Sequence, residues 1–185
     1  MDREISDRNI LDLFCEDFCG VVEKYCRYII VSGFLVIASG RIRGTEDIDM
    51  IMERLTFAEF KPLFNDLIAG GYQCIQSDSA ETVYEYLADN VSVRFSVKGK
   101  PTPEMEVKFA KDPLDEYQLR NRVKLELTGL NVWWATVNGT IAFKEELLKS
   151  PKDLEDARHL RIMYKEIISE EEIKQIKQMI RRYRL

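Results

Sequence analysis

Two aspartates inside an apolar run constrain the fold of this chain more than any other feature. Residues 47–52 read Asp-Ile-Asp-Met-Ile-Met, which predicts a short buried strand. Side chains two apart on a strand point to the same side, so Asp47 and Asp49 share one face. Two carboxylates held together repel each other unless a positive charge lies between them. Mg²⁺ or Mn²⁺ would supply that charge, because such ions take hard oxygen ligands. A polar strand end with two solvated aspartates is the alternative.

The residues before this strand form a second pattern. An apolar run at 28–31 ends at Ser32-Gly33, and another apolar run follows at 34–38. A basic, glycine-containing stretch at 41–45 then leads to Asp47. The order predicts a strand, a tight turn, a short helix over 34–39, and the aspartate strand.

This order resembles the nucleotidyltransferase superfamily, and within it the small prokaryotic members of the abortive-infection or toxin type. The matching positions are Ser32, Gly33, Gly40, Arg43, Thr45, Asp47, Ile48 and Asp49. Ser32-Gly33 departs from the commoner Gly-Gly or Gly-Ser, and it places a side chain where a glycine would lie. The match is tight over this stretch and loose over the rest of the chain.

The resemblance implies a fold and an activity. The expected fold is α+β, a small mixed sheet with helices on one face and a C-terminal helical appendage. The expected domains are an α/β core over 1–139 and a helical segment over 140–185 packed on it. The expected activity is metal-dependent transfer of an NMP from an NTP to a hydroxyl, with an RNA end (typically tRNA) or a protein side chain as acceptor.

A third carboxylate is needed beside the two aspartates, as metal ligand and general base. Residues 104–109 alternate strictly, so Glu104, Glu106 and Lys108 lie on one face of a predicted half-buried strand. Glu106 is the first choice because it is central, and Glu104 is the second. Exposed glutamates on an edge strand are the alternative, and aspartate is the more usual third acid in the superfamily.

The remaining candidate site residues would bind the triphosphate. Gly33 lets the backbone approach phosphate, while the Ser32 hydroxyl and free N–H groups at a helix start can hydrogen-bond to it. By the resemblance, basic and polar side chains complete the site: Arg43, Thr45, Lys144, Lys152 and Asp156. Arg43 as a plain surface arginine, and 151–156 as an ordinary charged helix start, are the alternatives. His159 is expected to be packed or solvated rather than catalytic.

Periodicity and capping signals predict the other elements. Helices are expected over 7–25, 56–69, 140–149, 152–168 and 170–184, with N-caps at Thr56, Ser150 and Ser169. Strands are expected over 72–76, 82–87, 91–97, 122–128 and 131–137. Trp133 and Trp134 lie in the last of these, where core or dimer packing is favoured over base stacking.

Composition limits the remaining function classes. No run approaches the length of a membrane span, and the four cysteines lack zinc-ligand spacing, which favours a reducing cytoplasm. The net charge of −5 argues against indiscriminate nucleic-acid binding. Two alternatives to the enzyme stay open, a nucleotide-binding module that has lost the chemistry and one half of a toxin–antitoxin pair. A homodimer is a further option.

Overall fold

The computed structural model describes residues 5–42, 44 and 47–185. A five-stranded sheet forms the centre, with strand order β1-β2-β5-β4-β3. The strands β2 and β5 run parallel, whereas the other neighbouring pairs are antiparallel. The strand bounds are β1 (Tyr28–Val31), β2 (Asp47–Met52), β3 (Tyr72–Cys74), β4 (Val93–Val97) and β5 (Glu104–Phe109).

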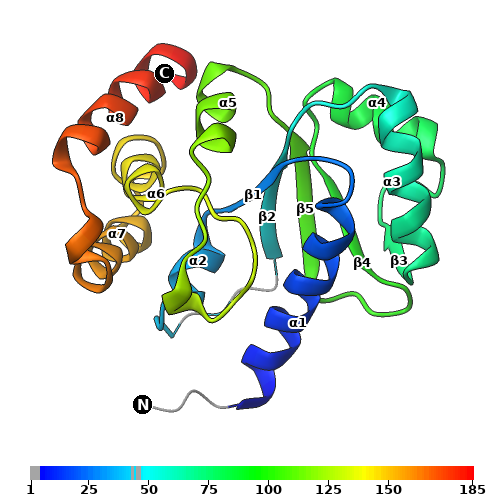
Figure 1. The fold of residues 1–185 in the computed structure, drawn as a ribbon, viewed down its shortest axis with the longest axis horizontal. Coiled ribbons are helices and arrows are strands. Elements are labelled where there is room, and N and C mark those ends of the chain that lie inside the picture. Colours follow the sequence, from blue (N-terminus) through cyan, green and yellow to red (C-terminus); the bar gives the residue numbers. More distant parts are fainter. Residues whose placement is uncertain (1–4, 43, 45–46) are drawn as a thin grey trace.

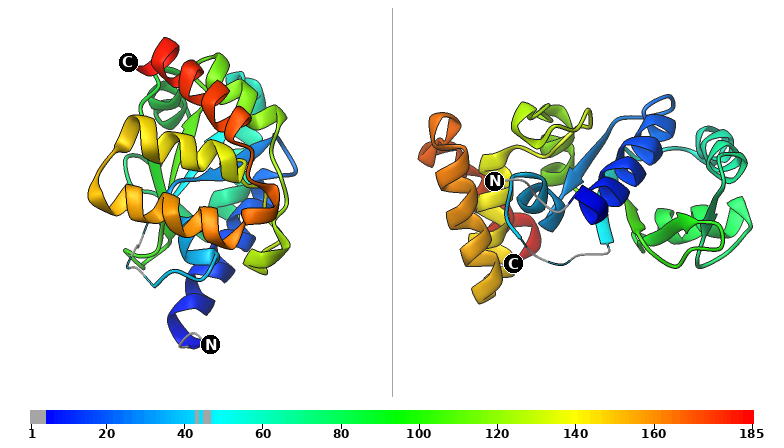
Figure 2. Two further views of the ribbon diagram at one scale, coloured as in Figure 1. Left: turned by 90° about the vertical axis from the view of Figure 1, so that its left-hand side faces the viewer. Right: turned by 90° about the horizontal axis from the view of Figure 1, so that it is seen from below.

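Helices cover both faces of this sheet rather than the single face expected from the sequence (Figure 1). The helices are α1 (Ile5–Val22), α2 (Gly33–Ala38), α3 (Phe57–Ala69), α4 (Ala80–Ala88), α5 (Pro113–Arg120), α6 (Val137–Phe143), α7 (Pro151–Met163) and α8 (Glu170–Arg184). Three short turns, η1 (Glu126–Thr128), η2 (Lys144–Leu148) and η3 (Lys165–Ile167), join them. Figure 2 shows α6, α7 and α8 gathered on one side of the molecule.

One face of the sheet carries a continuous apolar core under α1, α3 and α4. Aromatic rings from these helices pack on rings from the strands, as Phe18 does on Phe95 and Phe60 on Phe109. The opposite face is apolar only where Ile29 and Ile51 pack against α5. Beyond them β2 and β5 carry carboxylates, so this second face is polar at that end.

Local sequence signals predicted several helix starts, and the structure confirms them. Thr56 and Glu59 form a reciprocal capping box at the start of α3. Ser150 and Ser169 cap α7 and α8 by accepting backbone N–H groups three residues on. Such caps satisfy N–H groups that have no partner within the helix, and each contributes about 1 kcal/mol.

Two regions expected to be strands are not. Residues 82–87 belong to helix α4, because Ser79 caps it and Val83 and Leu87, four apart, are both buried. Residues 122–128 and 131–137 do not form a strand pair; single bridges join Trp134 to Val123 and to Ile30. A 3₁₀ turn, η1, and the start of α6 occupy the rest, because Thr136 caps α6 earlier than the predicted residue 140. Helix α5 had not been predicted.

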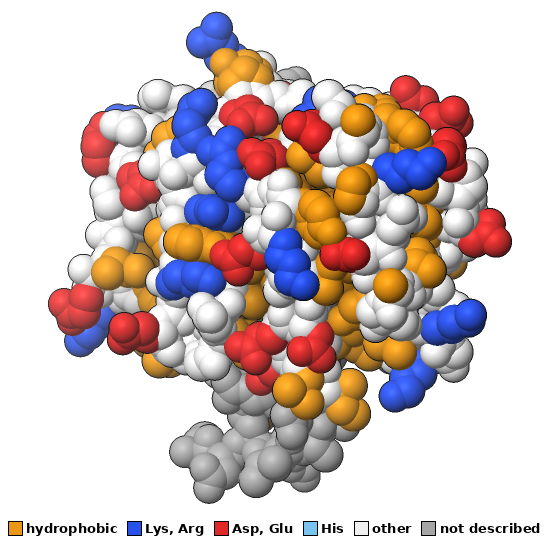
Figure 3. Space-filling model, turned by 45° about the vertical axis from the view of Figure 1, so that its right-hand side comes forward, with side chains coloured by type: hydrophobic (Ala, Val, Ile, Leu, Met, Phe, Trp, Pro, Cys, Tyr) orange, Lys and Arg blue, Asp and Glu red, His pale blue; other side chains and the backbone are white. Residues whose placement is uncertain are grey.

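The distribution of charged and apolar side chains on the surface agrees with the modest net charge of the sequence. On the face seen in Figure 3, acidic and basic side chains are interspersed among apolar ones, without a continuous basic field. Within the described parts of the chain, no helix combines the length and apolar character needed to cross a bilayer.

Candidate functional site

Four carboxylates lie on the polar face of two neighbouring strands. The parallel register of β2 and β5 sets Asp47 opposite Glu104 and Asp49 opposite Glu106. Alternation along each strand turns all four side chains to the face away from α1, α3 and α4. We call these four residues the acidic row. The register therefore places both candidates for the third acid beside the two aspartates.

The pKa of Asp49 is raised. Burial is the largest cause, and the Glu106 carboxylate is the second. Lys108 and a hydrogen bond from the Ser32 side chain act in the opposite direction, while Asp47 adds to the rise. A desolvated carboxylate among like charges is poised to take a cation.

An arginine on the next strand partly balances the acidic row. Arg94 on β4 lies opposite Glu106 in the antiparallel register. Its Nε and Nη2 donate to the same oxygen, Oε2 of Glu106, at 3.3 and 3.2 Å. Its Nη1 lies 3.7 Å from Oε2 of Glu104. These ion pairs raise the pKa of Arg94, chiefly through Glu106.

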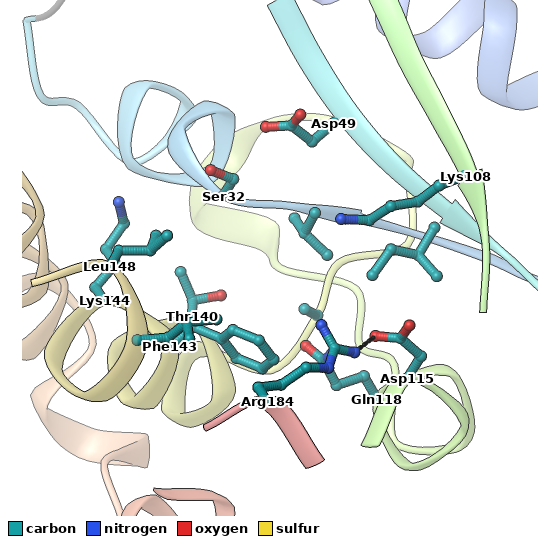
Figure 4. Close-up of a pocket in the computed structure, with 14 residues that line it drawn as sticks. Ser32, Asp49, Lys108, Asp115, Gln118, Thr140, Phe143, Lys144, Leu148 and Arg184 are labelled. Carbon is teal, nitrogen blue, oxygen red and sulfur yellow. Dashed lines mark hydrogen bonds and ion pairs between the residues drawn. The ribbon is translucent and has the colours of Figure 1, made fainter. Parts of the chain in front are cut away.

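A cavity of about 210 Å³ opens beside Asp49 (Figure 4). Asp49, Ser32 and Lys108 line it on the sheet side, and helical residues such as Thr140 and Phe143 line it on the other. The full lining is Val31, Ser32, Asp49, Ile51, Lys108, Asp115, Gln118, Ala135, Thr140, Phe143, Lys144, Leu147, Leu148 and Arg184. The cavity is thus a mainly apolar space with a few polar groups, the usual make-up of a small-molecule site.

Lys108 is a cavity residue that the sequence analysis did not select. It makes no ion pair or hydrogen bond within the described part of the chain, and its charge lowers the pKa of Asp49. Its place on the same alternating face as Glu104 and Glu106 was the signal that could have identified it. A lysine without a fixed counter-ion beside a cavity is available to bind an anion.

Ser32 has an unusual backbone conformation. It precedes α2 with φ 69° and ψ −136°, a region that glycine adopts freely and other residues rarely do. The superfamily's commoner glycine would carry less strain there. Strain of this kind concentrates at functional sites, where the surrounding structure enforces it.

Lys144 and Asp156 belong to a buried network of ion pairs beside the cavity. The Lys144 ammonium donates to Asp153 at 3.0 Å and to Asp156 at 2.8 Å, and Lys144 and Asp156 are almost completely buried. Arg41, after α2, donates to Asp156 and Glu155 from the other side. We call Arg41, Lys144, Asp153 and Asp156 the buried network, and it ties α7 to the loop after α2.

The other predicted residues are distributed unevenly. Gly33 begins α2 next to Ser32. Lys152 is exposed on α7 and is not among the residues lining the cavity. Arg43 and Thr45 lie outside the described residues. His159 is packed, with Nε2 3.2 Å from the Ser39 carbonyl.

The donor chemistry of the acidic row fits a divalent cation in part. Asp47 and Asp49 offer hard oxygen ligands on one face, and burial and the Glu106 carboxylate raise the pKa of Asp49. Across the described residues, however, no three His, Cys, Asp or Glu side chains converge in a ready-made metal site. Two aspartates on one strand suit a metal whose other ligands are substrate and water, the usual arrangement for Mg²⁺.

The chain has a mixed sheet, a small turn before α2, paired aspartates on the next strand, and helices that close a cavity beside them. This combination defines a nucleotidyltransferase fold. Solved structures agree. The antibiotic-resistance factor ANT(2'')-Ia in solution matches with a TM-score of 0.55 and 13% identity, covering 95% of this chain and 93% of that one. Its crystal structure in complex with adenylyl-2''-tobramycin matches with a TM-score of 0.52 and 13% identity, covering 94% and 98%.

A third structure extends the comparison. An antigenic nucleotidyltransferase-like protein from Paracoccidioides brasiliensis matches with a TM-score of 0.53 and 13% identity, covering 95% of this chain and 88% of that one. No protein-family model matches the chain, and no curated protein matches it in sequence. Likeness at this low identity establishes the nucleotidyltransferase fold and leaves the activity to be argued from the site.

Proposed function

We propose that this protein is a metal-dependent nucleotidyltransferase that moves an NMP from an NTP to an acceptor hydroxyl and releases pyrophosphate. The single observation that carries the proposal is the register of β2 and β5. It sets Asp49, which lines the cavity, beside Glu106 on the polar face of the sheet. The nucleotidyltransferase fold of the whole chain supports it.

Each residue of the site then has a task. Asp47 and Asp49 would hold Mg²⁺ or Mn²⁺, which when bound neutralises charge on the triphosphate. Glu106 accepts the proton of the acceptor hydroxyl as its oxygen attacks the α-phosphorus and the bond to pyrophosphate breaks. Lys108 binds phosphate oxygens from the cavity wall, and Gly33 lets the triphosphate approach the backbone.

The remaining candidates act around this centre. Ser32 would contact phosphate while its side chain also interacts with Asp49. Lys144 lines the cavity and would contact phosphate there, and Asp156, which accepts from the Lys144 ammonium at 2.8 Å, would orient it. Arg43 and Thr45 remain proposed phosphate contacts, whereas Lys152, which is exposed and not among the cavity-lining residues, would contribute least. We take residues 1–139 as the catalytic core and 140–185 as the helical segment that closes the site.

The acceptor is a hydroxyl compound of one of three kinds. An RNA end or a protein side chain follows from the sequence resemblance. A small polyol follows from ANT(2'')-Ia, which was crystallised with adenylyl-2''-tobramycin. The limited cavity volume of about 210 Å³ suits the small acceptor or a single inserted hydroxyl group.

The test is transfer from each α-labelled NTP in the presence of Mg²⁺, with bulk RNA, whole-cell protein and an aminoglycoside as separate acceptors. Wild-type protein should label one acceptor class, and Glu106→Gln should not. The matched control is Glu53→Gln, because Glu53 and Glu106 each have 26% side-chain exposure and each pair with an arginine that is 45% exposed. Wild-type protein that binds NTP but labels none of the acceptors would refute the proposal.

A nucleotide-binding module without transfer is the second candidate. The ion pair between Arg94 and Glu106 favours it, because that arginine already neutralises the proposed general base. Calorimetry separates the two. NTP binding with heat but without pyrophosphate release, in the presence of every acceptor class, would support the module.

A further inference from the structure

Arg94 is the charged residue of the site that the proposed reaction does not use. It is the outer member of a row across three strands, in which Asp49, Glu106 and Arg94 are register neighbours. Glu106 is therefore flanked by a carboxylate on one side and a guanidinium on the other. The charge on Arg94 is fixed under all ordinary conditions, because guanidinium does not lose its proton in proteins.

Arg94 hydrogen-bonds to one of the two carboxylate oxygens of Glu106 and not to the other. Two hydrogen bonds, from Nε and Nη2 of Arg94, end on Oε2. Within the described residues, Oε1 accepts no hydrogen bond. Arg94 also reaches Glu104 at 3.7 Å, so its fork is held by both glutamates of β5. One oxygen of Glu106 is thus engaged, and the other is left for a new partner.

The aspartates on β2 have a different environment. Asp49 lines the cavity and has a raised pKa, for which burial and Glu106 are the main causes. The ion pairs of Arg94 at 3.2 and 3.7 Å are with the two glutamates of β5, and its charge also acts on Asp47 over a longer distance. A cation beside Asp49 would lie on the β2 side of the row, away from the two glutamates that hold Arg94.

We propose that Arg94 is a positioning residue that holds Glu106 out of the metal's coordination sphere and keeps Oε1 as the proton acceptor. This rests on the proposed nucleotidyl transfer. Asp47 and Asp49 are then the metal ligands, and Glu106 is the base alone. The proton of the acceptor hydroxyl passes to Oε1 of Glu106 while its oxygen bonds to the α-phosphorus and pyrophosphate leaves with the electrons of the broken P–O bond. This division of labour accounts for the lack of a ready-made three-acid metal site among the described residues.

The chain contains a matched pair at the other end of the sheet. Arg27 donates to Glu53 at 2.8 Å, and the side-chain exposures, 45% and 26%, equal those of Arg94 and Glu106. Arg27 and Glu53 flank β1 and β2 at the ends remote from Asp47, because Tyr28 pairs with Met52. Arg27→Met therefore removes an equivalent charge and an equivalent ion pair without touching the site.

Mn²⁺ binding, followed by electron paramagnetic resonance without nucleotide, tests the proposal on the full chain. Arg94→Met should tighten Mn²⁺ binding about three- to tenfold, because a partly screened charge is removed and Glu106 is freed to ligate. Glu106→Gln in the wild-type background should change the affinity less than about threefold, whereas Asp49→Asn should weaken it at least about 30-fold. Arg27→Met should leave it unchanged.

Two outcomes of this experiment would overturn the proposal in different ways. Glu106→Gln that weakens Mn²⁺ binding as much as Asp49→Asn would make Glu106 a metal ligand and refute the division of labour alone. Wild-type protein that binds no Mn²⁺ even with a non-hydrolysable NTP would refute the metal-dependent function itself.

A kinetic measurement provides a second readout once the acceptor is known. Arg94→Met should lower kcat about 10- to 100-fold with little change in the KM for NTP, because a misplaced base affects only the chemical step. Arg94→Lys should recover part of kcat, since it restores the charge but not the fork. A change in KM with kcat unaltered would assign Arg94 to nucleotide binding instead. Thermal melting of each variant separates misfolding from these effects.

Discussion

The acidic row and the buried network differ in how far their charged side chains are paired with opposite charges. In the buried network Lys144 and Arg41 meet Asp153 and Asp156 at close range, and Lys144 and Asp156 have almost no contact with solvent. In the acidic row Arg94 lies 3.2 Å from Glu106 and 3.7 Å from Glu104, and among the described residues Lys108 makes no ion pair. Both regions border the same cavity, through Lys144 on one side and Asp49 on the other.

The difference separates structural charge from charge available for binding. A buried ion pair satisfies its own members, so it fixes the relative position of the elements that carry it. Carboxylates that outnumber their cations remain unsatisfied until a cation arrives, and they carry a cost in stability until then. On this basis the acidic row is the binding site, and the buried network is its support.

The largest effect is expected from Asp49→Asn. This change removes one metal-ligating charge at the cavity wall, and transfer should fall by about 10³-fold or more. The fold should not suffer, because asparagine is isosteric. Initial rates with the preferred NTP, beside Glu53→Gln, give the measurement. Transfer by Asp49→Asn protein at the wild-type rate would end the assignment of a metal-dependent nucleotidyltransferase.

Lys144→Met tests the other member of the comparison. It removes the ammonium that donates to buried Asp156 at 2.8 Å, although Arg41 still donates to Asp156, and the free energy of unfolding should fall by about 3 kcal/mol. Lys149→Met is the control, because Lys149 is 55% exposed and lies 3.9 Å from its partner Glu146, so it should cost less than about 0.5 kcal/mol. Urea denaturation measures both. Equal losses would show that burial of the network contributes nothing.

A smaller effect should distinguish two lysines that could each bind phosphate. Lys108→Ala removes the unpaired ammonium from the cavity wall and should weaken NTP binding about tenfold, which is about 1.4 kcal/mol. Lys152→Ala removes an exposed lysine away from the cavity lining and should weaken binding less than about twofold. Calorimetric titration at two salt concentrations compares them. The reverse order would move the triphosphate out of the cavity.

The pH dependence of stability should have opposite signs in the two regions. Because the folded-state pKa of Asp49 is raised, this group stabilises the fold at low pH and loses that contribution as pH rises through the raised pKa. Asp49→Asn should therefore melt above wild type at pH 7, with a difference that shrinks as pH falls towards 4.

Asp153 provides the matched case with the other sign. Burial opposes its ionisation, but hydrogen bonds from Ser150 and Lys144 leave its pKa lowered. Its contribution is present above the unfolded-state pKa, near 4, and is lost as pH falls through the lowered value. Asp153→Asn should melt below wild type at pH 7, and this deficit should vanish in acid. Calorimetric melting from pH 3 to 8 gives both curves, and parallel curves would contradict the comparison.

The sequence predicted best those features whose causes lie within a few residues. The Asp-Ile-Asp strand, the alternation of β5 and the cap at Thr56 are set by neighbouring residues, and each is found as expected. The pattern of residues 82–87 is compatible with both a helix and a strand. Val83 and Leu87 are spaced as on one face of a helix, whereas the short alternation suits a strand. Packing against α3 and the strands decides for the helix.

The sequence alone did not predict contacts between residues that are distant along the chain. Arg94 meets Glu106 only because β4 pairs with β5, and Arg41 meets Asp156 across more than a hundred residues. The resemblance selected Lys144 and Asp156 as candidate site residues. It did not predict that both side chains are buried. Trp134 packs on Phe34 in the core, which agrees with the favoured expectation, but it makes isolated bridges and does not lie in the expected strand pair.

Ser32 has a practical consequence for anyone who improves this protein by selection. Glycine at this position would relieve the left-handed backbone, so a screen that rewards heat resistance alone should favour Ser32→Gly. The same exchange would delete the side chain that lowers the pKa of Asp49. Thermostable descendants would then carry a more easily protonated aspartate, and their loss of performance would first be seen in mildly acidic media.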